Sequence, residues 1–76
     1  MNKARRNKLS DALDYLSMAR IMIRDIQEEE QESYDNMPES LQCSKKGDAM
    51  EYNIDKLSDV ADCIEEQEDG LREVIE

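Results

Sequence analysis

The chain has 76 residues and a formal net charge of −10, with 39% of its residues charged and 38% hydrophobic. This length allows one small domain. The chain contains no histidine, tryptophan or phenylalanine, only two glycines and one proline, which argues against an enzyme and against a cofactor. No apolar run approaches the roughly 20 residues that cross a bilayer, so we expect a cytosolic protein.

The cysteines argue against disulfides and a bound metal, and the net charge limits which macromolecules the chain can bind. Cys43 and Cys63 are too few for a disulfide framework, and without histidine or a CxxC pair they form no zinc ligand set. We therefore expect free thiols and no metal. An acidic chain repels nucleic-acid phosphates and anionic membrane surfaces. The expected partner is a protein with a basic or apolar surface, with no direct binding to nucleic acid or membrane.

The first predicted element is an amphipathic helix over about residues 3–32. Its apolar residues recur at alternating steps of four and three, which is the spacing of one helix face. They are Leu9, Ala12, Leu16, Ala19, Ile23 and Ile26. In heptad notation the leucines and Ile23 take the a positions, the alanines and Ile26 take d, and Tyr15 and Met22 widen the stripe at g.

A turn is predicted over about residues 33–44. Pro38 cannot extend a preceding helix because it lacks an amide hydrogen and biases the residue before it away from helical angles. Asn36, with Glu39 three residues later, is predicted to cap a short helical turn. Ser44 is the best N-cap for the next helix, although Gly47 stands where a capping box would have glutamate.

The second long helix is predicted over about residues 45–75. It repeats the heptad scheme with Met50, Leu57, Ile64 and Leu71 at a. The d and e positions are filled by Ile54, Val60, Ala61, Val74 and Ile75. The two helices and the turn therefore form a single helical-hairpin domain over residues 1–76.

Charge favours antiparallel pairing of the two helices. Residues 1–27 carry six basic and three acidic groups, a net charge of +3, whereas residues 28–76 carry four and seventeen, a net charge of −13. Antiparallel pairing sets Leu9 beside Leu71 and Ile23 beside Leu57. It also places the basic cluster Lys3, Arg5, Arg6 and Lys8 near the acidic end of the second helix, which explains this cluster better than phosphate binding does.

A hairpin of this size is not expected to be stable alone. Burial of one apolar stripe per helix barely offsets roughly 1.5 kcal/mol of ordering entropy per residue. The wide apolar face is typical of bundles with more than two helices, and the small Ala12 and Ala19 permit close helix approach. The predicted fold is an all-α, coiled-coil-like antiparallel two-helix hairpin. We expect it to assemble as a homo-oligomeric bundle, with a dimeric four-helix bundle favoured over a higher oligomer.

An acidic ridge follows the outer side of the second helix. Its carboxylates are Asp48, Asp55, Asp59, Asp62, Glu66, Asp69 and Glu73. A solvated face that keeps a small oligomer soluble is the favoured interpretation. The alternative is a mimic of the nucleic-acid backbone, although the carboxylates are spaced more widely than the phosphates of one DNA strand.

The turn holds the candidate binding residues. They are Tyr34, Asn36, Met37, Ser40, Leu41 and Gln42. This set is richer than a simple link between helices requires, and loops often carry function. The alternative is that Tyr34, Met37 and Leu41 only seal the end of the bundle. No arrangement resembles a catalytic site, and Cys63 has no neighbouring base that would make it a nucleophile.

The run EEEQESYDNMPESLQCSKKGDAME, residues 28–51, resembles uncharacterised small acidic helical proteins of bacteriophages and prophages, in which a helix leads into a DNMP-E-LQ type turn. Lys45, Lys46 and Gly47 depart from the more acidic, more helical start expected there. The resemblance implies a phage accessory protein with no catalytic residue to transfer.

From this resemblance we expect a viral, non-enzymatic protein that binds and blocks a host protein in the bacterial cytosol, as an anti-defence inhibitor. Two alternatives stay open. One is an oligomeric sponge that traps an immune signalling nucleotide between the turn residues and basic side chains. The other is the acidic nucleic-acid mimic.

Overall fold

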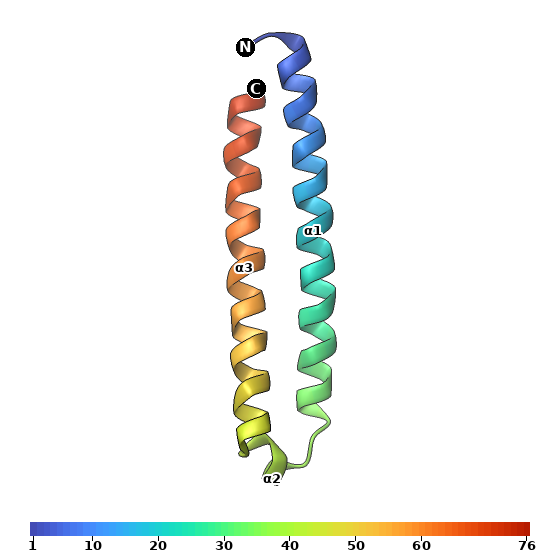
Figure 1. The fold of residues 1–76 in the computed structure, drawn as a ribbon, viewed down its shortest axis with the longest axis vertical. Coiled ribbons are helices and arrows are strands. Elements are labelled where there is room, and N and C mark those ends of the chain that lie inside the picture. The colour runs from blue at the N-terminus through green and yellow to red at the C-terminus, as the bar shows by residue number, and fades with distance from the viewer.

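The computed structural model describes all 76 residues as three helices without any strand. Helix α1 spans Lys3–Asp35, α2 spans Glu39–Gln42 and α3 spans Lys45–Ile75. α1 and α3 run antiparallel side by side in a rod of 58 × 14 × 13 Å, with both termini at one end and α2 at the other (Figure 1). The predicted all-α, coiled-coil-like helical hairpin is confirmed.

Helix α1 begins at a side-chain cap that the sequence analysis missed. The side-chain oxygen of Asn2 accepts a hydrogen bond from the backbone N–H of Arg5 at 2.8 Å, which satisfies one free donor of the first turn. The helix has no acidic residue in its first turn and no basic residue in its last, against the preference of the helix dipole. Packing against α3 must therefore contribute much of its stability.

The prediction that Asn36 caps the short helix α2 is wrong. Asn36 instead ends α1, and its backbone N–H donates to the carbonyl of Glu32 at 3.0 Å. Pro38 occupies the N-cap position of α2 without any side-chain cap. Its extended backbone directs its carbonyl to the N–H groups of Leu41 and Gln42, so the proline conformation itself starts this helical turn.

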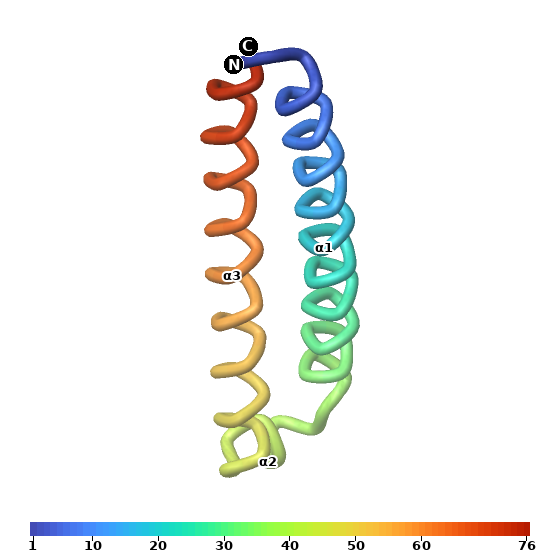
Figure 2. The backbone as a smooth tube through the Cα atoms, turned by 45° about the horizontal axis from the view of Figure 1, so that its top comes forward, coloured from blue at the N-terminus to red at the C-terminus, as the bar shows by residue number.

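Ser44 is the N-cap of α3, as predicted. At Gly47, the close approach of α2 leaves no room for a side chain. The Ser44 hydroxyl oxygen accepts from the Gly47 N–H at 3.3 Å, and the hydroxyl donates to the Leu41 carbonyl. A Cβ at position 47 would lie 2.0 Å from the carbonyl oxygen of Gln42. Only glycine lets α2 pack this closely beneath the first turn of α3, where Figure 2 shows it.

The seam between the long helices is rotated from the predicted one. Along α3 every seventh residue is buried, and these residues are Gly47, Ile54, Ala61 and Glu68. They occupy the predicted e positions. The a residues of α3 are only half-buried, and the d residues Val60 and Val74 are exposed. Ile54 and Ala61 are the only buried hydrophobic residues of the whole chain.

The helices are also shifted along each other relative to the prediction. The predicted register places Cys63 beside Ser17, whereas the Ser17 hydroxyl donates to Glu68, about five residues further along α3. The Tyr34 hydroxyl likewise donates to Glu51 at 2.8 Å. The shift is about 7 Å along the axis. α3 is displaced toward the turn end, where it begins beyond the last turn of α1 (Figure 1).

Candidate functional site

A buried carboxylate lies in the seam between α1 and α3, toward the end of the hairpin that holds the termini. Glu68 is 0% exposed, and it accepts hydrogen bonds from Arg20 Nε at 2.5 Å and from the Ser17 hydroxyl at 2.7 Å. Arg72 adds an ion pair at 3.6 Å. The hydrogen bond from Arg20, and next that from Ser17, lowers the pKa of Glu68, while the same bond raises the pKa of Arg20.

Further polar contacts continue along the same side. Arg24 pairs with Asp62 at 2.7 Å and with Glu65 at 3.3 Å. These partners on α1 and on α3 follow one another at helical steps of three and four, so they share one side of the hairpin. We call this side the polar face. It is formed by Ser17, Arg20, Arg24 and Tyr34 of α1 and by Glu51, Asp62, Glu65 and Glu68 of α3.

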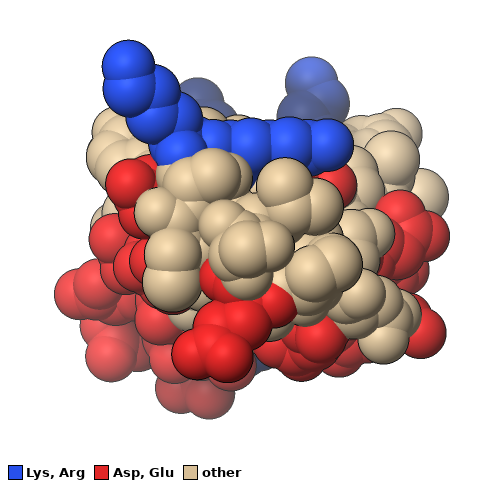
Figure 3. Space-filling model, turned by 90° about the horizontal axis from the view of Figure 1, so that it is seen from below, with Lys and Arg blue, Asp and Glu red and all other residues tan.

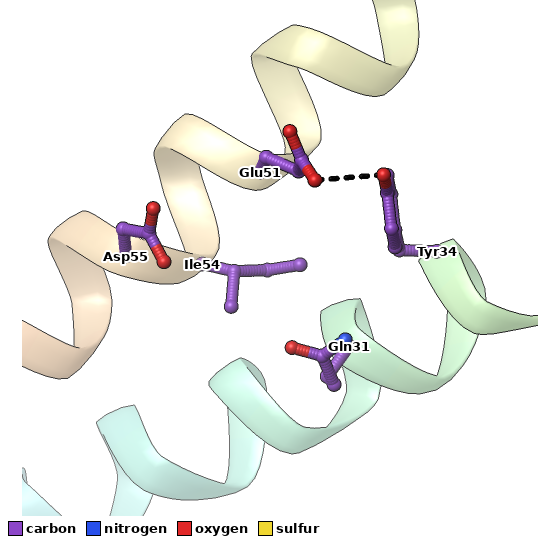
Figure 4. A pocket seen from close by; sticks show the side chains of 5 residues that line it. All are labelled: Gln31, Tyr34, Glu51, Ile54 and Asp55. Carbon is purple, nitrogen blue, oxygen red and sulfur yellow. Dashed lines mark hydrogen bonds between the residues drawn. The ribbon is translucent and has the colours of Figure 1, made fainter. Parts of the chain in front are cut away.

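A small pocket lies on the polar face near the turn. It has a volume of about 200 Å³ and is lined by Gln31, Tyr34, Glu51, Ile54 and Asp55 (Figure 4). The hydrogen bond to Glu51 raises the pKa of Tyr34 to about 12. Two carboxylates and no basic side chain line the pocket, so its charge does not suit a phosphate group.

The structure does not bring the six predicted turn residues together around one cavity. Only Tyr34 lines a pocket. The Gln42 side-chain amide donates to the backbone carbonyl of Tyr34 at 2.9 Å and so ties α2 to the end of α1. Met37 is half-buried, whereas Asn36, Ser40 and Leu41 are exposed at the tip of the hairpin. Tyr34 and Gln42 therefore stabilise the turn, whereas Asn36, Ser40 and Leu41 are accessible for contact with another molecule.

All seven carboxylates of the acidic ridge are exposed. Asp62 pairs with Arg24 and Asp69 with Arg72, and the other five form no ion pair. Seen from the turn end, acidic side chains cover much of the surface while Lys and Arg gather mainly on one side (Figure 3). No group of three or more His, Cys, Asp or Glu residues lies close enough together to hold a metal ion.

The side opposite the polar face carries an apolar stripe whose residues are half-buried or exposed. On α1 its residues follow steps of three and four, with Tyr15, Met22 and Ile26 being 72%, 63% and 49% exposed. A shallow groove of about 310 Å³ is lined by Ile26 and Glu30 of α1 and by Asn53, Lys56 and Leu57 of α3, so both helices contribute to this side. We call it the apolar face. It is formed by Ala12, Tyr15, Ala19, Met22 and Ile26 of α1 and by Leu57, Val60, Ile64, Leu71 and Val74 of α3.

The predicted ion pairing of the basic cluster is wrong. The five ion pairs of the structure involve only Arg20, Arg24 and Arg72, so Lys3, Arg5, Arg6 and Lys8 have no acidic partner. The reason is the shifted register, because the first turns of α1 extend beyond the C-terminal end of α3 (Figure 1). The glutamates at the other end of α1 are likewise unpaired, and these are Glu28, Glu29, Glu30 and Glu32.

Three further observations bear on function. Cys43 and Cys63 are free, as predicted, and both are exposed. None of the three helices combines the length and the apolar character of a membrane-spanning segment. Comparison with protein-family models, with curated proteins and with solved structures finds no match. The surface of the hairpin is therefore the basis for a functional proposal.

Proposed function

We propose that this chain is a non-enzymatic interaction protein that acts as a homo-oligomeric helical bundle, with two hairpins forming a four-helix unit. One observation carries the proposal. Only two hydrophobic residues are buried, whereas ten large hydrophobic side chains are exposed. Burial this small does not offset the entropy of ordering 76 residues, so the apolar face needs a cover.

The proposed activity is to bind and block a host protein. The resemblance of residues 28–51 to phage and prophage proteins supports an anti-defence role in the cytosol of a bacterial host. A net charge of −10 per chain would steer the bundle toward a basic partner. When the apolar face is covered by another hairpin, the exposed Asn36, Ser40 and Leu41 at the tip stay available for contact with the host protein.

Native mass spectrometry and light scattering test the oligomer. We expect particles of at least about 18 kDa, twice the 8.9 kDa of the chain. Met22→Lys places a charge on the apolar face and is expected to shift the population toward monomer. Ile21→Lys is the matched control, because Ile21 is 52% exposed but lies outside the apolar face. A folded wild-type monomer at 8.9 kDa would refute the proposal.

Affinity capture tests the second half of the proposal. Immobilised wild-type chain should retain a defined host protein, and Leu41→Asp should lose it while the oligomeric mass is unchanged. Ile21→Asp serves as the control, because Ile21 is 52% exposed, against 46% for Leu41, and lies within α1 away from the tip. Equal capture by all three chains would remove the tip from the binding site.

Nucleic-acid mimicry is the second candidate, and the exposure of the whole acidic ridge favours it. Replacing Asp55, Asp62 and Asp69 by Asn should then abolish partner binding, and unchanged affinity at low salt would eliminate mimicry. The nucleotide sponge has less support because two carboxylates line the turn pocket. Titration with cyclic and linear nucleotides measures this binding directly, and absence of binding at micromolar nucleotide rules out the sponge.

A further inference from the structure

The apolar stripe of α1 ends in opposite charges. Continuing its steps of three and four beyond Ala12 reaches Lys8, and continuing beyond Ile26 reaches Glu29. Both charged residues are exposed and neither forms an ion pair. The α1 side of the apolar face is therefore a complete heptad seam, apolar along its length, with a cation at one end and a carboxylate at the other.

We propose that a second copy of this chain covers the apolar face, with its α1 antiparallel to the first α1 and a twofold axis passing beside Ala19. This inference rests on the self-association proposed above and adds its geometry. Tyr15 then lies beside the partner's Met22, and Lys8 lies beside the partner's Glu29. A C2 interface is self-complementary, and the small alanine at the axis lets the two helices approach closely.

Charge separates this arrangement from the others. With the two α1 helices parallel, Lys8 would face the partner's Lys8 and Glu29 would face the partner's Glu29, which is repulsive. With α1 packed on the partner's α3 in the register of the hairpin, Lys8 would again extend beyond the end of α3 and stay unpaired. Only the antiparallel pairing of α1 with α1 gives both charges a partner.

Helix α3 supports the same axis independently. The hydrogen bond of Ser17 to Glu68 sets Ala19 level with about position 66 or 67 of α3. A twofold axis at Gln67 brings Val60 beside the partner's Val74, and these three residues follow one another at steps of seven on the uncovered side. Each helix then has only antiparallel neighbours, as in an up-and-down four-helix bundle.

Disulfide cross-linking tests the axis. In a Cys43→Ser, Cys63→Ser background, Ala19→Cys should give a covalent dimer on mild oxidation, because a disulfide needs Cα atoms about 4.4–6.8 Å apart. Ala12→Cys alone should stay uncross-linked, whereas a mixture of Ala12→Cys and Ile26→Cys chains should form a mixed dimer. Efficient cross-linking of Ala12→Cys alone, or none at Ala19→Cys, would overturn the inference.

Charge exchange tests the ends of the seam. Lys8→Glu or Glu29→Lys alone should weaken the dimer roughly fivefold at low salt, since each dimer contains two such exposed pairs. The double variant should recover wild-type affinity. Lys3→Glu is the control, because this substitution makes the same change of charge at a position outside the seam. If Lys3→Glu weakened the dimer equally, or if the double variant did not recover, the proposed register would be contradicted.

The native mass of the same samples keeps the two proposals apart. A dimer with cross-links at other positions overturns the axis beside Ala19 and leaves oligomerisation intact. A folded monomer overturns both.

Discussion

The two glycines of α3 allow one substitution to be tested in two environments. Gly→Ala inside a helix ordinarily stabilises by about 0.5–1 kcal/mol, because alanine loses less backbone entropy. At Gly70 a Cβ would have no heavy atom within 4 Å, so Gly70→Ala should show this gain. At Gly47 the Cβ would lie 2.0 Å from the Gln42 carbonyl oxygen and 2.6 Å from that of Leu41. Overpacking costs about 1–3 kcal/mol, so Gly47→Ala should lose about 1–2 kcal/mol net.

Urea unfolding followed by helical circular dichroism measures both variants. Protein concentration must be held equal, because self-association contributes to the apparent stability. With a slope of about 1 kcal/mol per M, the midpoint should fall by about 1–2 M for Gly47→Ala and rise by about 0.5–1 M for Gly70→Ala. If the two variants were equally stable, the packing of α2 beneath α3 would not constrain position 47.

Three other substitutions probe the seam. Glu68 has a lowered pKa, so its ion pair with Arg20 stabilises the fold above about pH 4.5, and this stabilisation is lost as the pH falls through the folded-state pKa. In thermal melts from pH 7 to 3, the melting temperature of Glu68→Gln should therefore depend less on pH than that of the wild type. Tyr34 has a pKa raised to about 12, so its hydrogen bond to Glu51 stabilises the fold below pH 10 and is lost toward pH 12. In an alkaline absorbance titration, Tyr34→Phe should lack the tyrosine ionisation that the wild type shows near pH 12. Ile54→Ala should cost about 2–3 kcal/mol in urea unfolding, against less than about 0.5 kcal/mol for the exposed Ile21→Ala, and equal costs would contradict the assigned core.

Local signals in the sequence were enough to predict the elements of the fold but not how they align. Helical periodicity, Pro38 and the Ser44 cap place two helices and the turn, because each signal acts within a few residues. The seam could not be read in the same way. The apolar residues of each helix satisfy two overlapping heptads, and periodicity does not say which heptad meets the neighbouring helix. The register is set by contacts between residues far apart in the sequence, such as those of Glu68 with Ser17 and Arg20.

The site was predictable only in part. The heptad pattern indicates the residues of the apolar face, including Tyr15 and Met22 at g. Glu68 was missed because it lies within an acidic run, although its spacing of seven from Ala61 places it in the buried column. The turn residues were assigned by composition, and composition does not reveal that Tyr34 and Gln42 have structural partners.

The ion pair between Glu68 and Arg20 has a consequence for sliding of the helices. A displacement of α3 by one heptad would exchange Ile54 for Ala61 along the seam, a modest change in apolar contact. The same slip would separate the buried Glu68 from Arg20 and Ser17 and leave it only the longer ion pair with Arg72 on its own helix, which is more costly. Glu68 therefore selects one register of the two helices among several registers that bury similar apolar area. Chains carrying both Arg20→Leu and Glu68→Leu are expected to stay helical but to populate several alignments, visible as multiple cross-linked species between α1 and α3.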